Sequence, residues 1–168
     1  MNIKELQSII PSVFADDSRV WIYQCNRPFT DKETMEINEQ LRQFYTQWMS
    51  HDEPVKGWAT VLFNRYIVIM ADENVVKLGG CSTDDSMKVI KSFERQYQVI
   101  LFDRLSFTFL VKDKTEMLPM NQLQYAIDNN FINKDTLFFN NTVGTKKELL
   151  EKWLIPIGES WIASRVKF

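Results

Sequence analysis

The stretch WATVLFNRYIVIMA, residues 58–71, decides the fold of this 168-residue chain. Its β-branched and aromatic residues are too frequent for a helix and predict extended backbone. We interpret it as two strands, 58–63 and 66–71, that fold back at Asn64-Arg65. Asparagine suits the first turn position, whereas arginine lacks the tolerance of positive φ that glycine has. One long strand is therefore the alternative.

Two elements precede this stretch. Residues 20–25 read VWIYQC, an aromatic and β-branched run that predicts a strand. Thr30 and Glu33 then form a capping box, in which the hydroxyl accepts from a first-turn amide and the carboxylate reaches back. Behind the box, apolar residues at helical spacing place one face of a helix against a core until about Ser50: Ile37, Leu41, Phe44 and Trp48.

A second helix and a fourth strand follow. The segment GGCSTDDS, residues 79–86, opens the helix, with Ser82 as the expected N-cap and Asp85 as a first-turn acid. Residues 105–111 then alternate and predict a half-buried strand. The order β-α-β-β-α-β is that of ferredoxin-like split βαβ domains. We therefore expect an α+β fold of this topology over residues 18–112, with an antiparallel sheet and helices on one face.

The last third of the chain, residues 113–168, is expected to be a C-terminal helical extension that packs on this core, so that the chain forms a single domain. It contains a predicted helix over 120–129 and a short strand at 137–139. A further capping box, Thr145 to Glu148, opens a helix through Trp153.

Composition excludes several classes of function. Twenty basic and 22 acidic residues leave a net charge of −2, which gives no strong field for duplex nucleic acid or an anionic membrane. No window approaches 18 apolar residues, and the N-terminal residues lack the apolar run of a signal peptide, so we expect a cytoplasmic protein without a membrane span. Two distant cysteines and one histidine cannot build a zinc cluster, and we expect neither a metal nor a cofactor.

Cys81 poses the main chemical question. The positive end of a helix favours a thiolate, whereas the neighbouring Asp84 and Asp85 disfavour one. A nucleophile also needs a base, and His51 is the single histidine. We expect His51 at the end of the first helix, at the opposite edge of the fold from Cys81. The sequence therefore favours an unreactive Cys81 and a structural His51.

A glycine-rich turn before a helix can also bind phosphate. The P-loop pattern GxxxxGK[ST] does not occur in the chain, and Asp84 and Asp85 place carboxylates where the anion would lie. The same acids, with Asp72 and Glu73, could hold a hard cation, but their spacing matches no calcium loop and favours solvated helix caps.

Four polar residues are candidates for ligand binding. Gln24 and Arg27 follow the first strand, and Ser82 and Asp84 begin the second helix. If the two central strands are parallel neighbours, these residues gather at one sheet edge. We then expect Arg27 within ion-pair reach of Asp84 or Asp85, either as a structural clamp or as part of a polar pocket beside Cys81.

Aromatic residues offer a second surface. For the aromatic residues of the strands, we expect packing in the core, and a surface for a partner or ligand is the alternative: Trp21, Tyr23, Trp58 and Tyr66. Those of the tail are expected to pack on the domain: Phe138, Phe139, Trp153, Trp161 and Phe168.

Three groups of residues carry a resemblance that spans nearly the whole chain: WIYQ at 21–24 with NRPF at 26–29, GCSTD at 80–84 with Ser86, and FNNTV at 139–143 with Trp153, Pro156, Ser160 and Trp161. Together they resemble a family of small uncharacterised bacterial proteins of about this length, often labelled "ABC transporter ATPase". The label conflicts with the missing P-loop, and the resemblance implies no activity. It implies that Gln24, Arg27, Cys81, Ser82 and Asp84 belong to recurring motifs.

The sequence thus favours a non-enzymatic binding or accessory module with a protein or small-molecule partner, and it allows a homo-oligomer. A small cysteine-dependent enzyme centred on Cys81 is the alternative. A nucleotide-binding protein without a P-loop is the third hypothesis.

Overall fold

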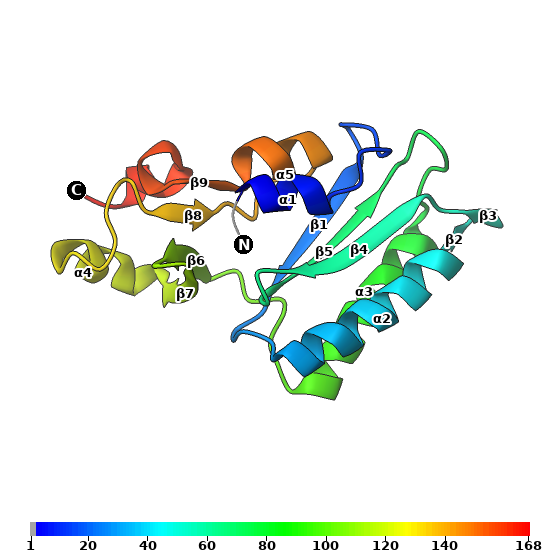
Figure 1. Cartoon of the computed structure of the whole chain (residues 1–168), viewed down its shortest axis with the longest axis horizontal. Helices are drawn as coiled ribbons and strands as arrows, with labels where there is room; N and C mark the ends of the chain where they lie inside the picture. The colour runs from blue at the N-terminus through cyan, green and yellow to red at the C-terminus, as the bar shows by residue number, and fades with distance from the viewer. Residues whose placement is uncertain (1–2) are drawn as a thin grey trace. The chain divides into compact units, whose positions relative to one another are not determined.

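The computed structural model describes residues 3–168, which divide into two compact units (Figure 1). The N-terminal unit comprises residues 10–103 and 144–147, and the C-terminal unit comprises residues 3–9, 104–143 and 148–168. The N-terminal unit ends at residue 103, before the strand predicted at 105–111, although the sequence predicts that strand in the same unit as the first three. The expected packing of residues 113–168 on that core stays a prediction.

A three-stranded antiparallel sheet forms the centre of the N-terminal unit. Its strands lie in the order β1 (Arg19–Gln24), β5 (Tyr66–Ala71) and β4 (Gly57–Leu62). Helices α2 (Asp31–Gln47) and α3 (Gly80–Tyr97) lie side by side and pack on one face of this sheet (Figure 1). Both helices fall where the sequence predicts them.

The hairpin predicted at residues 58–71 is confirmed, and the alternative of one long strand is wrong. Leu62 pairs with Tyr66 across the turn. The turn begins one residue earlier than expected, because Phe63 and Asn64 take the positive φ values, 53° and 49°. Arg65 instead points inward, where it is buried and its Nη1 donates to the Cys25 carbonyl at 3.0 Å.

A second, shorter hairpin follows α2. Strands β2 (Met49–Ser50) and β3 (Glu53–Pro54) pair antiparallel, and the turn residues His51 and Asp52 have φ values of 52° and 64°. The sequence placed His51 at the end of the helix. That prediction is wrong, because α2 ends at Gln47 and its C-cap, Trp48, is extended.

The structure confirms an α+β fold with antiparallel sheets, but it does not confirm the ferredoxin-like topology. The predicted fourth strand, β6 (Ser106–Val111), pairs with β7 (Lys114–Pro119) and β8 (Leu137–Phe139) in a separate sheet. The two-residue turn at Lys112-Asp113 brings β6 and β7 together locally, so β6 finds its partners without reaching β1.

Residues 144–147 lie along part of the β1 edge instead. The Val20 amide donates to the Gly144 carbonyl at 2.9 Å, and Arg19 forms an antiparallel bridge with Thr145. Lys146 is buried, and its Nζ donates to the Phe14 carbonyl at 2.7 Å. A segment that the sequence assigned to the C-terminal extension therefore belongs to the N-terminal unit.

The C-terminal unit is built on a four-stranded sheet in the order β7-β6-β8-β9, with β9 at Leu154–Pro156. The expectation of a mainly helical extension is wrong, because β7 and β9 join the strand predicted at 137–139. The helices α4 (Leu123–Asp128) and α5 (Lys146–Lys152) lie within their predicted ranges. The other helical elements are short: α1 (Ile3–Ile9) and the 3₁₀ turns Met120–Gln122, Ile157–Glu159 and Trp161–Arg165.

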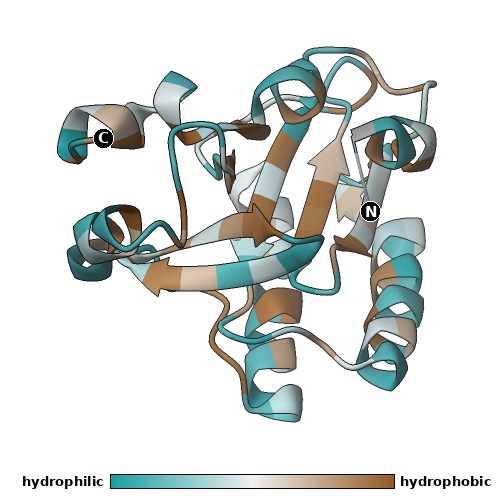
Figure 2. Ribbon diagram, turned by 60° about the vertical axis from the view of Figure 1, so that its left-hand side comes forward, coloured by the Kyte–Doolittle hydropathy of each residue, from teal (hydrophilic) through white to brown (hydrophobic). Residues whose placement is uncertain are grey.

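Each unit has its own apolar cluster, as expected for compact units. In the N-terminal unit the side chains between sheet and helices include Ile37, Leu41, Ile69, Ile90 and Phe93, all fully buried. In the C-terminal unit the rings of Phe109 and Phe138 pack at a tilt, with 5.7 Å between their centroids. Figure 2 shows apolar residues concentrated on the strands and hydrophilic ones along the outer sides of the helices. Within the described residues, no helix has the length and apolarity needed to cross a bilayer.

Candidate functional site

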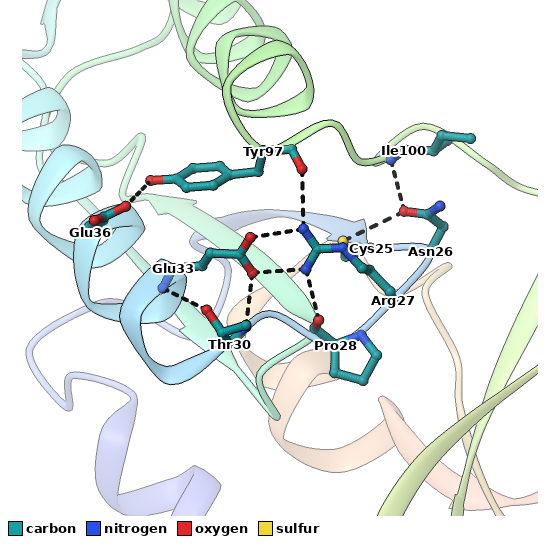
Figure 3. A network of polar contacts seen from close by, with 9 residues as sticks. All are labelled: Cys25, Asn26, Arg27, Pro28, Thr30, Glu33, Glu36, Tyr97 and Ile100. Atoms are coloured by element: carbon teal, nitrogen blue, oxygen red, sulfur yellow. Dashed lines mark hydrogen bonds and ion pairs between the residues drawn. The ribbon is translucent and has the colours of Figure 1, made fainter.

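Arg27 forms a clamp at the edge where β1 ends (Figure 3). Its two terminal nitrogens donate to the two carboxylate oxygens of Glu33, both at 2.8 Å. Nη2 also donates to the Tyr97 carbonyl, at the last residue of α3, at 3.1 Å. The guanidinium thereby joins the start of α2 to the end of α3, where its positive charge complements the helix dipole.

The capping box predicted at the start of α2 is confirmed. The Thr30 hydroxyl accepts from the Glu33 amide at 3.1 Å, and the Glu33 carboxylate accepts from the Thr30 amide at 2.9 Å. Glu33 therefore serves the cap and the clamp at once. Hydrogen bonds from Arg27, supported by the Thr30 amide, lower the pKa of Glu33 to about 2.

Gln24 and Cys25, which precede Arg27 at the end of β1, are buried. Gln24 is 4% exposed, and its Oε1 accepts from the Tyr66 hydroxyl at 3.1 Å. Cys25 is fully buried, and burial raises the pKa of its thiol. Asn26 accepts from the Ile100 amide at 2.9 Å, which fastens the segment after α3 (Figure 3). Gln24 and Arg27 thus have structural partners.

The expected gathering of Gln24 and Arg27 with Ser82 and Asp84 is wrong. β1 and β5 are antiparallel, so their C-terminal ends lie at opposite edges of the sheet. Arg27 meets the end of α3 at Tyr97, and Asp84 lies thirteen residues earlier, about 20 Å along a helix. Arg27 pairs with Glu33, and Asp85 pairs with Lys88 at 3.0 Å, so the predicted ion pair does not form.

At the opposite edge, α3 starts differently from the sequence prediction. Its N-cap is Gly79, not Ser82, and no side chain caps it. Ser82 is buried in the helix, where its carbonyl accepts from Trp48 Nε1 at 2.9 Å. Asp84 is exposed. Of the predicted acidic group, Asp72 is buried, and Glu73 accepts from the Leu78 amide at 3.1 Å.

Cys81 is an exposed, free thiol in the first turn of α3. Contrary to the sequence prediction, His51 lies at this same edge: a β-carbon on Gly79 would be 2.9 Å from its Nε2. α2 runs antiparallel to β1, so its end meets the start of α3. Within the described residues, no hydrogen bond joins Cys81 to His51, and no group of three or more side chains could hold a metal ion.

The aromatic residues divide into core and surface. On the N-terminal sheet, Tyr66 is fully buried and Trp21 and Tyr23 pack against the core under the helices, as predicted. In the tail, the aromatic residues at 138, 139 and 153 are buried, whereas Trp161 and Phe168 are 39% and 56% exposed.

Sequence reasoning missed an exposed aromatic group around α4. Tyr125, within the helix, is 66% exposed, and Phe131, just after it, is 65% exposed. We call Tyr125, Phe131 and Phe168 the α4 surface. The only sequence signal was their residue type, since Tyr125 and Phe131 belong to no alternating pattern.

Hydrogen bonds to the backbone hold the α4 surface in place. Asn130 has a φ of 58°, and the Phe131 amide donates to the Ala126 carbonyl at 2.9 Å, which closes the helix in a Schellman motif. The Gln124 side chain accepts from the Lys167 amide and donates to its carbonyl, both at 2.8 Å. The residue before Phe168 is therefore fixed to α4.

Comparison of the chain with protein families, with curated proteins and with solved structures finds no match.

Proposed function

We propose that the chain is a non-enzymatic binding or accessory protein of the cytoplasm, and that its α4 surface contacts a protein partner. The observation that carries this proposal is the exposure of Tyr125, Phe131 and Phe168, each more than half exposed. Interfaces are enriched in aromatic residues, which contribute much of the binding energy. The two free cysteines suit a reducing compartment.

Two features favour a protein over a small molecule as the partner. Small-molecule sites are concave and bury most of the ligand, whereas the α4 surface consists of side chains that project from a helix and its hydrogen-bonded neighbours. The Schellman motif and the Gln124 bonds already order the backbone, so binding sacrifices little conformational entropy there. A second copy of the chain is one such partner.

The partner is first trapped and then tested by substitution. We expect a photo-crosslinking residue in place of Phe131 to give a discrete protein adduct in cells, and one in place of Met35 to give none. Met35 is a matched control, because it is 74% exposed on α2. An adduct of twice the chain's mass would identify a second copy.

With that partner purified, Tyr125→Ser combined with Phe131→Ser should weaken its affinity at least about tenfold, since truncated interface aromatics commonly cost more than 1 kcal/mol. Isothermal titration calorimetry measures the change, and Met35→Ser should leave the affinity unchanged. Equal affinity of the double variant and the wild type would reject the α4 surface as the contact.

The Cys81 enzyme is the second candidate, favoured by one observation. The exposed thiol and the His51 imidazole lie at the same end of α3, which has no side-chain cap. Amides without caps and a nearby base are the groups that a nucleophilic thiol uses. The sequence argument against this pair depended on a separation that the structure does not have.

Alkylation separates the two candidates. In a Cys25→Ser variant, a non-enzymatic protein should react with iodoacetamide at Cys81 no faster than free cysteine does at pH 7. In a Cys81→Ser variant, the fully buried Cys25 should react at least about 100-fold more slowly, which checks that the fold is intact. A Cys81 rate above that of free cysteine, lowered by His51→Gln, would establish the thiol function and contradict a non-catalytic protein.

A further inference from the structure

The first turn of α3 is held from outside the helix. Its N-cap, Gly79, has no side chain that could accept from the turn's amides. The Ser50 hydroxyl, in β2, accepts from the Gly79 amide at 3.1 Å and donates to the Lys77 carbonyl at 2.8 Å. The Trp48 indole, just before β2, donates to the Ser82 carbonyl at 2.9 Å. The segment that carries the β2–β3 hairpin therefore bonds to the chain just before α3 and, at Ser82, to the first turn of the helix.

Gly79 is a glycine for reasons of space. Its φ is −87°, and no glycine of the described chain has a positive φ, so backbone conformation does not require glycine there. A β-carbon at Gly79 would lie 2.9 Å from His51 Nε2, closer than β-carbons approach other atoms, and 3.2 Å from Cε1, which is also tight. A β-carbon at the adjacent Gly80 would meet nothing within 4 Å.

We propose that the β2–β3 hairpin is a strap across the first turn of α3, and that Gly79 is the seat of the His51 imidazole. A serine or aspartate at this position would cap the helix more strongly than glycine. It would also displace the imidazole. The hairpin thus satisfies the amide of the N-cap residue through Ser50, and the glycine leaves room for the tip of the strap.

The strap accounts for the glycine at position 79 and not for Gly80, the first residue of α3, where a β-carbon would meet nothing within 4 Å. It is independent of the α4 surface, which belongs to the other unit. It also holds whether or not Cys81 is reactive, because each of its contacts is made by other residues.

The two glycines provide a matched pair for the test. His51 is the only histidine of the chain, so its ring protons give isolated NMR signals. In the wild type and in Gly80→Ala, we expect nuclear Overhauser effects between the imidazole and the α protons of residue 79. In Gly79→Ala these effects should disappear while the rest of the amide spectrum keeps its dispersion, because an exposed side chain can rotate away without unfolding the protein.

Ser50→Ala tests the hydrogen bond between the hairpin and the Gly79 amide. Losing the hydroxyl should raise the hydrogen-exchange rate of the Gly79 amide about tenfold or more, with amides in the middle of α3 unchanged. Imidazole contacts that persist in Gly79→Ala, or are missing from the wild type, would contradict the proposal that Gly79 makes room for the His51 imidazole. An exchange rate at Gly79 unaffected by Ser50→Ala would overturn the strap.

Discussion

Asp72→Asn is expected to lower the free energy of unfolding by about 2–4 kcal/mol, because it leaves buried hydrogen-bond donors and a cation without their acceptor. Asp72 directly follows β5 and is 3% exposed. Its Oδ2 accepts from Lys56 Nζ at 3.2 Å and from the Ala15 amide at 3.3 Å. Its Oδ1 accepts from the Asn74 amide at 3.1 Å. Asparagine preserves the shape but removes the charge and one acceptor.

The carboxylate matters because it fixes the segment before β1. Lys56, held by Asp72, also donates to the Val13 carbonyl at 2.6 Å and lies 5.1 Å from the centre of the Phe14 ring. Losing Asp72 therefore releases Lys56 and, through it, residues 13–15. Burial raises the pKa of Asp72, but the bonds from Lys56, Ala15 and Asn74 outweigh it and hold that pKa below its usual range.

Urea unfolding at pH 7 measures the effect. Asp85→Asn is the matched control, since Asp85 forms an aspartate–lysine pair with Lys88 at 3.0 Å on the surface, and it should leave the midpoint unchanged. The contribution of Asp72 should be complete above about pH 5 and decline as the pH falls through its lowered pKa. Equal midpoints for Asp72→Asn and Asp85→Asn would show that the bonds to the buried Asp72 carboxylate add no stability.

Local signals predicted most elements of the N-terminal unit correctly. The capping box at Thr30 and Glu33, the apolar spacing in α2 and the β-rich run at 58–71 each act within a few residues, and each appears in the structure. Pairing between distant segments was harder to predict. The sequence of β7, KTEMLP, carries charges at alternate positions and gives no strand signal, yet its turn to β6 determines which sheet β6 joins.

The predicted site was wrong because of one error in the predicted topology. The central strands were treated as parallel, which placed Arg27 and Asp84 at one edge and His51 far from Cys81. The observed antiparallel pairing of β1 and β5 reverses both relations. The sequence also did not predict which aromatic side chains are buried, because residue type alone does not separate the buried Phe138 from the exposed Phe131. Residue choice gave the candidates, and only the strand directions decided which of them meet.

Glu33→Gln is expected to lower the free energy of unfolding at pH 7 by about 1–2 kcal/mol. Glutamine still accepts from the Thr30 amide, so this substitution separates the Arg27 ion pair from the capping box. The lowered pKa of Glu33, about 2, would correspond to a larger loss. Solvent screening reduces the effect, because the Arg27 side chain is 40% exposed.

The stabilisation that Glu33 contributes should depend on pH in a defined direction. A carboxylate whose pKa is lower in the folded state stabilises the fold fully above its unfolded pKa and loses that effect as it is protonated. The difference between wild type and Glu33→Gln should therefore be constant above about pH 5 and shrink as the pH falls towards 2. Urea unfolding at several pH values measures it.

Glu39→Gln is a stringent control, because Glu39 lies on the same helix and forms a similar two-pronged pair with Arg42, at 2.7 and 3.0 Å, in which both side chains are more than half exposed. It should leave the midpoint unchanged, since the exposed partners of Glu39, Arg42 and Gln43, lie on the same helix and link it to no other element. Arg27, by contrast, connects Glu33 to the carbonyl of Tyr97 and so links two helices. If both substitutions had the same effect, the Arg27 clamp would be no more than a surface ion pair.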